Sequence, residues 1–259
     1  MSASSSLLTS VIAIAVVMVG TWVVSVVRRD ASIVDIVWGS GFVVVAVVTH
    51  ARDSASGAAD WFVTTMVALW GLRLSIHLGV RNHGAGEDYR YRAMRRHWGD
   101  RFWLISLVTV FALQGVMMWL VSLPVQLVRA GDTPGVDAWL IVGVVIAATG
   151  LVVETVGDLQ LRAFKASAEN SGQIMDRGLW AWTRHPNYFG DSLFWWGIAI
   201  MVLGVPSARW GLIGAVVMNV LLVRVSGVAM LERSLSRRKP EWEAYVARTP
   251  AFLPRPPRR

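Results

Sequence analysis

Residues 178–197 read GLWAWTRHPNYFGDSLFWWG and join a compact polar cluster to a long apolar run. Five side chains that can hydrogen-bond surround Pro186: Thr183, Arg184, His185, Asn187 and Tyr188. Proline suits the first turn of a helix, because the N–H group that it lacks would have no partner there. The stretch therefore predicts a membrane helix that begins near Pro186 and carries a polar cluster at its N-terminal end, which we call its mouth.

The chemistry of this cluster allows two interpretations. A cation, an imidazole, an amide and a phenol that converge on the positive end of a helix can bind an anion. Trp, Tyr and Arg side chains also anchor ordinary loops at the membrane interface. We favour a binding site, because many hydrogen-bonding groups fall within few residues.

The composition is that of a membrane protein. Of the 259 residues, 54% are apolar and 16% are charged, which is far from the balance of a soluble domain. The absence of Cys excludes disulfides, thiolate metal sites and Cys nucleophiles. The formal charge of +8 does not indicate nucleic-acid binding, since the basic residues punctuate hydrophobic runs and form no continuous stripe.

Apolar runs near the 20 or so residues that cross a bilayer predict an all-α, polytopic membrane protein with about seven helices. The expected spans are 7–27, 33–49, 61–80, 102–123, 136–157, 187–204 and 210–231. Because no repeat or linker divides the chain, we expect residues 1–259 to form one membrane domain. The Pro- and Arg-rich residues 255–259 are expected to be disordered.

The distribution of basic residues predicts the orientation. With the N-terminus outside, 20 of the 25 Lys and Arg residues fall at the inner face and three at the outer face. Basic loops remain in the cytoplasm, so we expect a cytoplasmic C-terminus and a location in the cell (inner) membrane.

Charged residues inside the expected spans indicate a polar cavity near the cytoplasmic side. Asp35 lies on the second span, Arg73 and His77 share one stripe of the third, and the fifth ends in ETVGDLQLRAFK. A buried charge in a membrane is costly and usually functional. Snorkelling side chains and capping acids are the alternative.

The loop at residues 82–101 combines Glu87 and Asp88 with Tyr89, Tyr91 and several Arg residues. It could cap a cavity and attract phosphates, or it could be an ordinary basic loop that binds lipid headgroups. The histidines show no metal-binding spacing, so no metal site is expected.

Several motifs together resemble the DUF1295 branch of the steroid 5α-reductase superfamily. In chain order they are LWGLRLSIHL, EDYRY, DLQLRAFK, TRHPNYFGD with WWG, VSGVAMLE and EAYVARTPAFLP, and the resemblance covers about residues 30–254. It implies an all-helical membrane reductase that uses NADPH to reduce a C=C bond conjugated to a carbonyl. An RHPxYxG element followed by an acid and a Tyr is also shared with isoprenylcysteine methyltransferases, which bind S-adenosylmethionine.

The resemblance also implies site residues. It places Arg73, Asp158, Arg162, Asn187, Tyr188 and Gly190 in the cofactor cavity, with Gly190 allowing the cofactor close to the backbone. The polar residues Glu154, Arg184, His185 and Asp191 complete the expected cofactor-binding set. Asp191 stands where the family usually has Glu. Trp70 stands where the steroid reductases place a Tyr that polarises the substrate ketone. The candidate proton donors are therefore Asp35, His77 and Tyr188, in that order.

Three functions are compatible with the sequence. The leading hypothesis is NADPH-dependent reduction of an enone-like, lipid or steroid-like substrate. The second is methyl transfer from S-adenosylmethionine in the same cavity, and the third is a non-catalytic lipid-binding membrane protein. The expected partners are a small hydrophobic substrate and membrane lipids, without nucleic acid.

Overall fold

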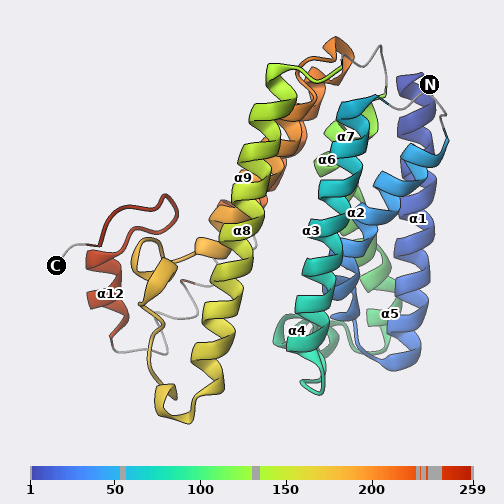
Figure 1. Cartoon of the computed structure of the whole chain (residues 1–259). Helices are drawn as coiled ribbons and strands as arrows, with labels where there is room; N and C mark the ends of the chain where they lie inside the picture. Colours follow the sequence, from blue (N-terminus) through green and yellow to red (C-terminus); the bar gives the residue numbers. More distant parts are fainter. Residues whose placement is uncertain are drawn as a thin grey trace. The chain divides into compact units, whose positions relative to one another are not determined.

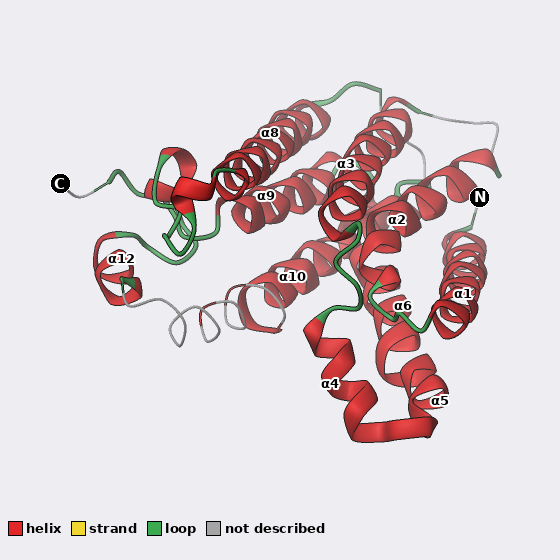
Figure 2. Ribbon diagram, turned by 90° about the horizontal axis from the view of Figure 1, so that it is seen from below, coloured by secondary structure: helices red, strands yellow, loops and turns green. Residues whose placement is uncertain are grey.

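The structure is a computed structural model that describes residues 2–52, 57–129, 135–225, 228, 232 and 241–257. Within these ranges the chain forms helices and loops and contains no strand (Figures 1 and 2), which confirms the all-α prediction. Residues 226, 227 and 229–231 of the last expected span lie outside the described residues, as do 258 and 259 of the expected disordered tail.

The α-helices are α1 (Ala3–Arg28), α2 (Ile33–Ala51), α3 (Ala58–Asn82), α4 (Tyr89–Trp98), α5 (Phe102–Ser106), α6 (Leu113–Val121), α7 (Leu123–Leu127), α8 (Ala138–Ala166), α9 (Pro186–Met201), α10 (Leu212–Val220) and α12 (Trp242–Arg248). The short 3₁₀ segments are η1 (Gly99–Arg101), η3 (Ala168–Asn170), η4 (Gly178–Ala181) and η5 (Pro206–Gly211). Two π-helical segments, η2 (Leu107–Ala112) and η6 (Leu221–Val225), continue neighbouring helices.

Six helical stretches of the described chain are long and apolar enough to cross a membrane. They are Ala3–Arg28, Ile33–Ala51, Ala58–Asn82, Tyr89–Val121, Ala138–Ala166 and Pro206–Val225. Helix α9 corresponds to the remaining expected span, and its 16 residues make it shorter than these six. The protein is therefore an all-helical chain with the character of an integral membrane protein.

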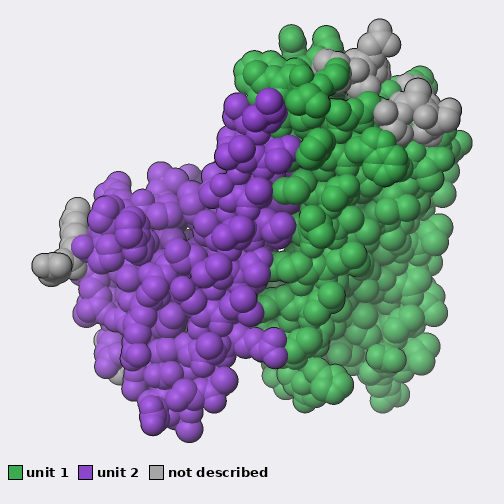
Figure 3. All heavy atoms as spheres, viewed as in Figure 1, with its two compact units in different colours: residues 1–140, 201–214 green, residues 141–200, 215–259 purple. Residues whose placement is uncertain are grey.

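The chain divides into two compact units, which are coloured separately in Figure 3. Unit 1 comprises residues 1–140 and 201–214, and unit 2 comprises residues 141–200 and 215–259. Each unit is described by itself below.

In unit 1, α2 and α3 cross at two glycines. A Cβ atom on Gly39 would collide with the carbonyl oxygen of Gly71, and a Cβ on Gly71 would collide with that of Gly39. Beside this crossing, the fully buried rings of Phe42 and Trp70 meet edge to face at 5.5 Å. Trp70 is thus a core residue of the α2–α3 pair.

In unit 2, α8 and α9 pack closely through small residues. A Cβ on Gly150 would collide with the backbone of Phe194, and one on Gly197 would collide with Ala147. Since Gly157 lies against Asn187 at the other end of the contact, the two helices run antiparallel. This close packing brings the end of α8, with Glu154 and Asp158, beside the first turn of α9.

Candidate functional site

The predicted site residues fall in both units. Asp35, Arg73 and His77 belong to unit 1, where Arg73 and His77 are half-buried on α3. The other predicted residues belong to unit 2: Glu154, Asp158, Arg162, Arg184, His185, Asn187, Tyr188, Gly190 and Asp191. Within unit 2, Asp158, Asn187 and Tyr188 lie where α8 meets the start of α9, and Arg184 and His185 immediately precede α9.

Helix α9 begins at Pro186, as the sequence predicts. The residues just before it are buried: Thr183 is 1% exposed and His185 is 2% exposed. The Thr183 hydroxyl accepts a hydrogen bond from the backbone N–H of His185 at 3.3 Å. The polar cluster is therefore folded into the protein at the mouth of α9.

Arg184 is the centre of this cluster. Its Nε and Nη2 atoms donate to one carboxylate oxygen of Glu232 at 2.9 and 2.7 Å, and its Nη1 atom donates to the carbonyl of Thr249 at 2.5 Å. The guanidinium also lies 5.8 Å from the ring centre of Trp242. These contacts engage all three guanidinium nitrogens, so the phosphate-binding role expected of Arg184 would compete with them.

His185 contacts the same carboxylate oxygen, with its Nε2 atom 3.3 Å from Glu232, and its ring stacks on Tyr188 at 5.7 Å between centroids. Burial alone would raise the pKa of Glu232. The hydrogen bonds and positive charges of His185 and Arg184 outweigh that effect and hold the pKa below its ordinary value. Glu232 is therefore ionised at neutral pH.

The polar mouth of α9 contains a second pair of side chains. The Asn187 amide nitrogen donates to Asp158 at 3.1 Å, and the Asn187 amide oxygen accepts from the backbone N–H of Tyr188. Asp158 is 7% exposed, whereas Asn187 and Tyr188 are half-buried. An amide and a carboxylate side by side can recognise hydroxyl and amino groups, such as those of a nucleoside.

Four further predicted residues have different settings. A Cβ on Gly190 would collide with the backbone of Glu154, which gives Gly190 a helix-packing role in place of the expected close approach to a cofactor. Glu154 and Asp191 are buried, at 3% and 9% exposure. Arg162 is exposed near the end of α8.

Sequence reasoning did not include Glu232, Tyr245 and Thr249 among the site residues. The Tyr245 hydroxyl donates to the carbonyl of Trp180 at 2.6 Å, and burial raises the pKa of Tyr245. The signal for Glu232 and Tyr245 was present, because a late acid and a late Tyr complete the pattern shared with the methyltransferases. No sequence signal marked the carbonyl of Thr249.

The segment after α12 lies along the residues before α9. The backbone N–H of Arg184 donates to the carbonyl oxygen of Pro250, and the hydroxyl of Thr183 donates to the carbonyl oxygen of Phe252. The backbone N–H of Arg255 donates to the carbonyl oxygen of Trp182. Arg255 therefore has a defined backbone contact, although it belongs to the tail expected to be disordered. The C-terminal segment holds the polar cluster in place.

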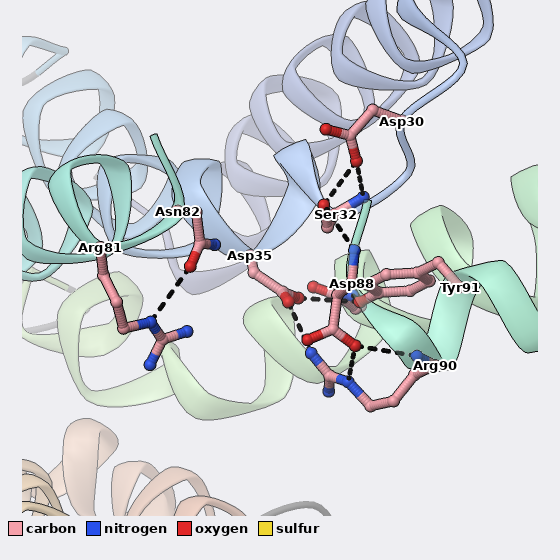
Figure 4. Close-up of polar contacts among 9 residues, drawn as sticks. Asp30, Ser32, Asp35, Arg81, Asn82, Asp88, Arg90 and Tyr91 are labelled. Atoms are coloured by element: carbon pink, nitrogen blue, oxygen red, sulfur yellow. Dashed lines mark hydrogen bonds and ion pairs between the residues drawn. The ribbon is translucent and has the colours of Figure 1, made fainter. Parts of the chain in front are cut away.

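Unit 1 contains a separate polar cluster around Asp35, shown in Figure 4. One oxygen of Asp35 accepts from the Tyr91 hydroxyl at 2.8 Å, and the other accepts from Nη2 of Arg90 at 2.7 Å. Gln114 donates in turn to the Tyr91 hydroxyl at 3.3 Å. The structure thus pairs Asp35, the first candidate proton donor, with a phenol that sequence reasoning did not assign to it.

The EDYRY motif (residues 87–91) attaches this cluster to the start of α2. Asp88 caps α4 and accepts from Nε of Arg90 at 2.9 Å, while Glu87 forms a two-bond pair with Arg95 and accepts from the backbone N–H of Ala31. Burial alone would raise the pKa values of Glu87 and Asp88, but these hydrogen bonds hold both below their ordinary values. Both acids are therefore ionised, and Glu87 holds the motif against the α1–α2 connection.

No group of three or more His, Cys, Asp and Glu side chains that could hold a metal ion occurs among the described residues.

Comparison with known proteins gives one family and two curated relatives. The family model described as "Protein of unknown function (DUF1295)" matches residues 21–249. Over 86 residues the chain is 33% identical to the probable O-methyltransferase ustE of Ustilaginoidea virens, covering 32% of this chain and 30% of that protein. Over 141 residues it is 27% identical to the nickel-cobalt-cadmium resistance protein NccN of Alcaligenes xylosoxydans xylosoxydans, covering 53% of this chain and 63% of that protein.

The matched stretches thus span less than two thirds of the length of either relative. No solved structure matches the chain.

Proposed function

This chain belongs to the DUF1295 family, and we propose that it is an integral membrane enzyme that transfers a methyl group from S-adenosylmethionine to a lipophilic acceptor. This reverses the order of the two enzymatic hypotheses drawn from the sequence. The observation that carries the proposal is the contact of Arg184 and His185 with Glu232 in unit 2.

That contact matters because it brings together residues of one motif that are far apart in the sequence. The RHPNYFG element, a late acid and a late Tyr form the motif shared with isoprenylcysteine methyltransferases. In unit 2, Arg184 and His185 of this element contact Glu232, and Tyr245 is bonded to Trp180. The similarity to a protein named as a probable O-methyltransferase supports the same reaction class.

The polar groups at the mouth of α9 fit S-adenosylmethionine better than NADPH. Asn187 and Asp158 offer an amide and a carboxylate for the hydroxyl and amino groups of a nucleoside. The stacked rings of Tyr188 and His185 offer an aromatic face for a cation such as a sulfonium. NADPH would require cations for its phosphates, and the guanidinium of Arg184 is already engaged by Glu232 and Thr249.

The residues of the chain would orient the acceptor and manage its proton. When bound, S-adenosylmethionine would supply an electrophilic methyl group for a new bond to the acceptor oxygen, and its sulfur would keep the electron pair of the broken C–S bond. Glu232 accepts from Nε2 of His185, which leaves Nδ1 of the imidazole to take the proton that the acceptor hydroxyl or carboxyl group releases. The acidic partner thus holds His185 in the tautomer that a base requires.

Ligand-dependent stability tests this proposal. A ligand at 100 times its Kd stabilises the folded state by about 2.7 kcal/mol, so S-adenosylmethionine should raise the melting temperature of the purified protein. NADPH at the same concentration should leave it unchanged. A larger shift with NADPH would contradict the proposal and favour a reductase.

A specific observation keeps NADPH-dependent reduction as the second candidate. Reduction of an enone needs a hydride at one carbon and a proton at the next, and the Tyr91 hydroxyl bonded to Asp35 is a suitable proton donor. Under this alternative, Tyr91→Phe would abolish NADPH oxidation that depends on an enone lipid and would leave NADPH binding unchanged.

A further inference from the structure

A cavity of about 570 Å³ lies in unit 1, and one of its lining residues, Arg95, pairs with Glu87 of the EDYRY motif. It is lined by the C-terminal part of α1 and by residues from α4 to α5: Ser25, Val26, Arg29, Arg95, Gly99, Asp100, Phe102, Trp103 and Ser106. Its volume suits a small polar group, and its lining mixes charges, hydroxyls and aromatic rings. We propose that this cavity binds the headgroup of a zwitterionic phospholipid, one that carries a phosphate and a primary ammonium.

The charges of the lining are balanced. Arg95 donates to Glu87 at 3.0 and 2.8 Å, so its charge is largely neutralised within the chain. Arg29 and Asp100, both exposed, then contribute one positive and one negative charge to the cavity. A guanidinium suits a phosphate and a carboxylate suits an ammonium, so this pair matches a zwitterionic headgroup better than a purely anionic one.

The backbone places Arg29 in an uncommon conformation. Arg29 is the cap residue of α1, with a φ of 51°, and its N–H donates to the carbonyls of Ser25 and Val26. Non-glycine residues rarely adopt this left-handed conformation. The preceding Arg28 ends the regular helix and does not line the cavity, so the turn separates the two neighbouring arginines.

The surroundings of the cavity are those of a membrane interface. The indole N–H of Trp22 donates to the carbonyl of Trp103 at 2.8 Å, and the two rings lie 6.1 Å apart. Trp103 is 50% exposed, and tryptophans of this kind gather at headgroup level. Exposed apolar side chains continue along α1 and along α5–η2, namely Val23, Val27, Leu104 and Val108, and they could contact acyl chains.

Lipid binding at this cavity would be independent of methyl transfer, because none of the lining residues belongs to the cluster at the mouth of α9. It follows from a cavity, a charge pair and an aromatic rim that occur together at one end of α1.

Lipid competition followed by native mass spectrometry tests the proposal. Purified protein is offered an equal mixture of phosphatidylethanolamine and phosphatidylglycerol, and wild type should retain phosphatidylethanolamine preferentially. Arg29→Gln should weaken that retention about tenfold, the effect of losing a charge-assisted hydrogen bond. Arg28→Gln is the matched control, since it removes the same charge one residue away, and it should behave as wild type.

Asp100→Asn should remove the preference for phosphatidylethanolamine over phosphatidylglycerol while both lipids still bind. Soluble glycerophosphoethanolamine should displace the lipid, and inorganic phosphate at the same concentration should not. Equal effects of Arg29→Gln and Arg28→Gln would overturn the site. Equal displacement by inorganic phosphate would show a simple phosphate site and overturn the headgroup assignment.

Discussion

Arg184 and Glu232, which are 48 residues apart in the sequence, form an ion pair in which Nε and Nη2 of the guanidinium lie 2.9 and 2.7 Å from the same carboxylate oxygen. The pair connects Arg184, two positions before the start of α9, to Glu232, which follows α10 in the sequence. The bond from Arg184 to the Thr249 carbonyl adds a contact with the C-terminal segment. The mouth of α9 is therefore held from two later parts of the chain.

Removal of Arg184 should destabilise unit 2. In Arg184→Met, the partly buried Glu232 loses its main partner and the carbonyl of Thr249 loses a donor, at a cost of about 2–4 kcal/mol. Arg162→Met is the control, because Arg162 is exposed on α8 of the same unit. Thermal unfolding in detergent measures both, and equal melting temperatures would contradict the assigned role of the pair.

Glu232 should make the stability of the folded protein depend on pH in the acidic range. A carboxyl whose pKa is lower in the folded state contributes stability that is fully present above its ordinary pKa, about 4.3, and is lost as the pH falls through the folded value. Wild type should thus lose more stability between pH 5 and pH 3 than Glu232→Gln, which is already weakened at pH 7. Denaturation midpoints across this range measure the difference, and parallel curves would show that the pair does not stabilise the fold.

A methyl group added at Gly39 should destabilise the α2–α3 crossing. Gly39→Ala places a Cβ against the carbonyl of Gly71, and overpacking of this kind costs about 1–3 kcal/mol. Gly20→Ala is the matched control, because no atom lies within 4 Å of its added Cβ and alanine favours a helix. The control should melt at or above the wild-type temperature, and similar losses in both variants would argue against the crossing.

The orientation of α9 can be tested with single cysteines, since the natural chain has none. If α9 crosses the membrane, Ser171→Cys before it and Arg209→Cys after it lie on opposite sides, and the excess of inner basic residues predicts that Ser171 is cytoplasmic. A membrane-impermeant thiol reagent applied to intact cells should label only Arg209→Cys. Labelling of both or of neither would show that α9 does not cross.

Much of the fold follows from the sequence. A membrane helix forms its backbone hydrogen bonds within itself and faces lipid, so it is recognisable as an apolar run. The start of α9 at Pro186 was predictable, because a proline stands where the polar cluster gives way to an apolar run. Helix α9, with 16 residues, is shorter than the six long apolar stretches.

The site was less predictable, because the partner of a polar side chain depends on tertiary contacts. Asp35 was expected to line a polar cavity, but its partners Arg90 and Tyr91 follow some 55 residues later and were not predicted. Arg184 was expected to meet phosphates, but nothing local shows that its nitrogens reach Glu232 and Thr249. Likewise, only the crossing of α2 and α3 explains a buried Trp70.

Methyl transfer itself is the most direct test of the proposed function. Membranes containing the protein are incubated with S-adenosylmethionine labelled in its methyl group, and the label in the lipid fraction is measured. Wild type should transfer label, and so should Asn219→Ala, which removes the amide bonded to Ser192 in the same unit. Asn187→Ala should reduce affinity for S-adenosylmethionine roughly 5- to 150-fold, the effect of one hydrogen bond lost in a desolvated site. Absence of label from wild-type lipids, together with NADPH oxidation by the same membranes, would contradict the account and support the reductase instead.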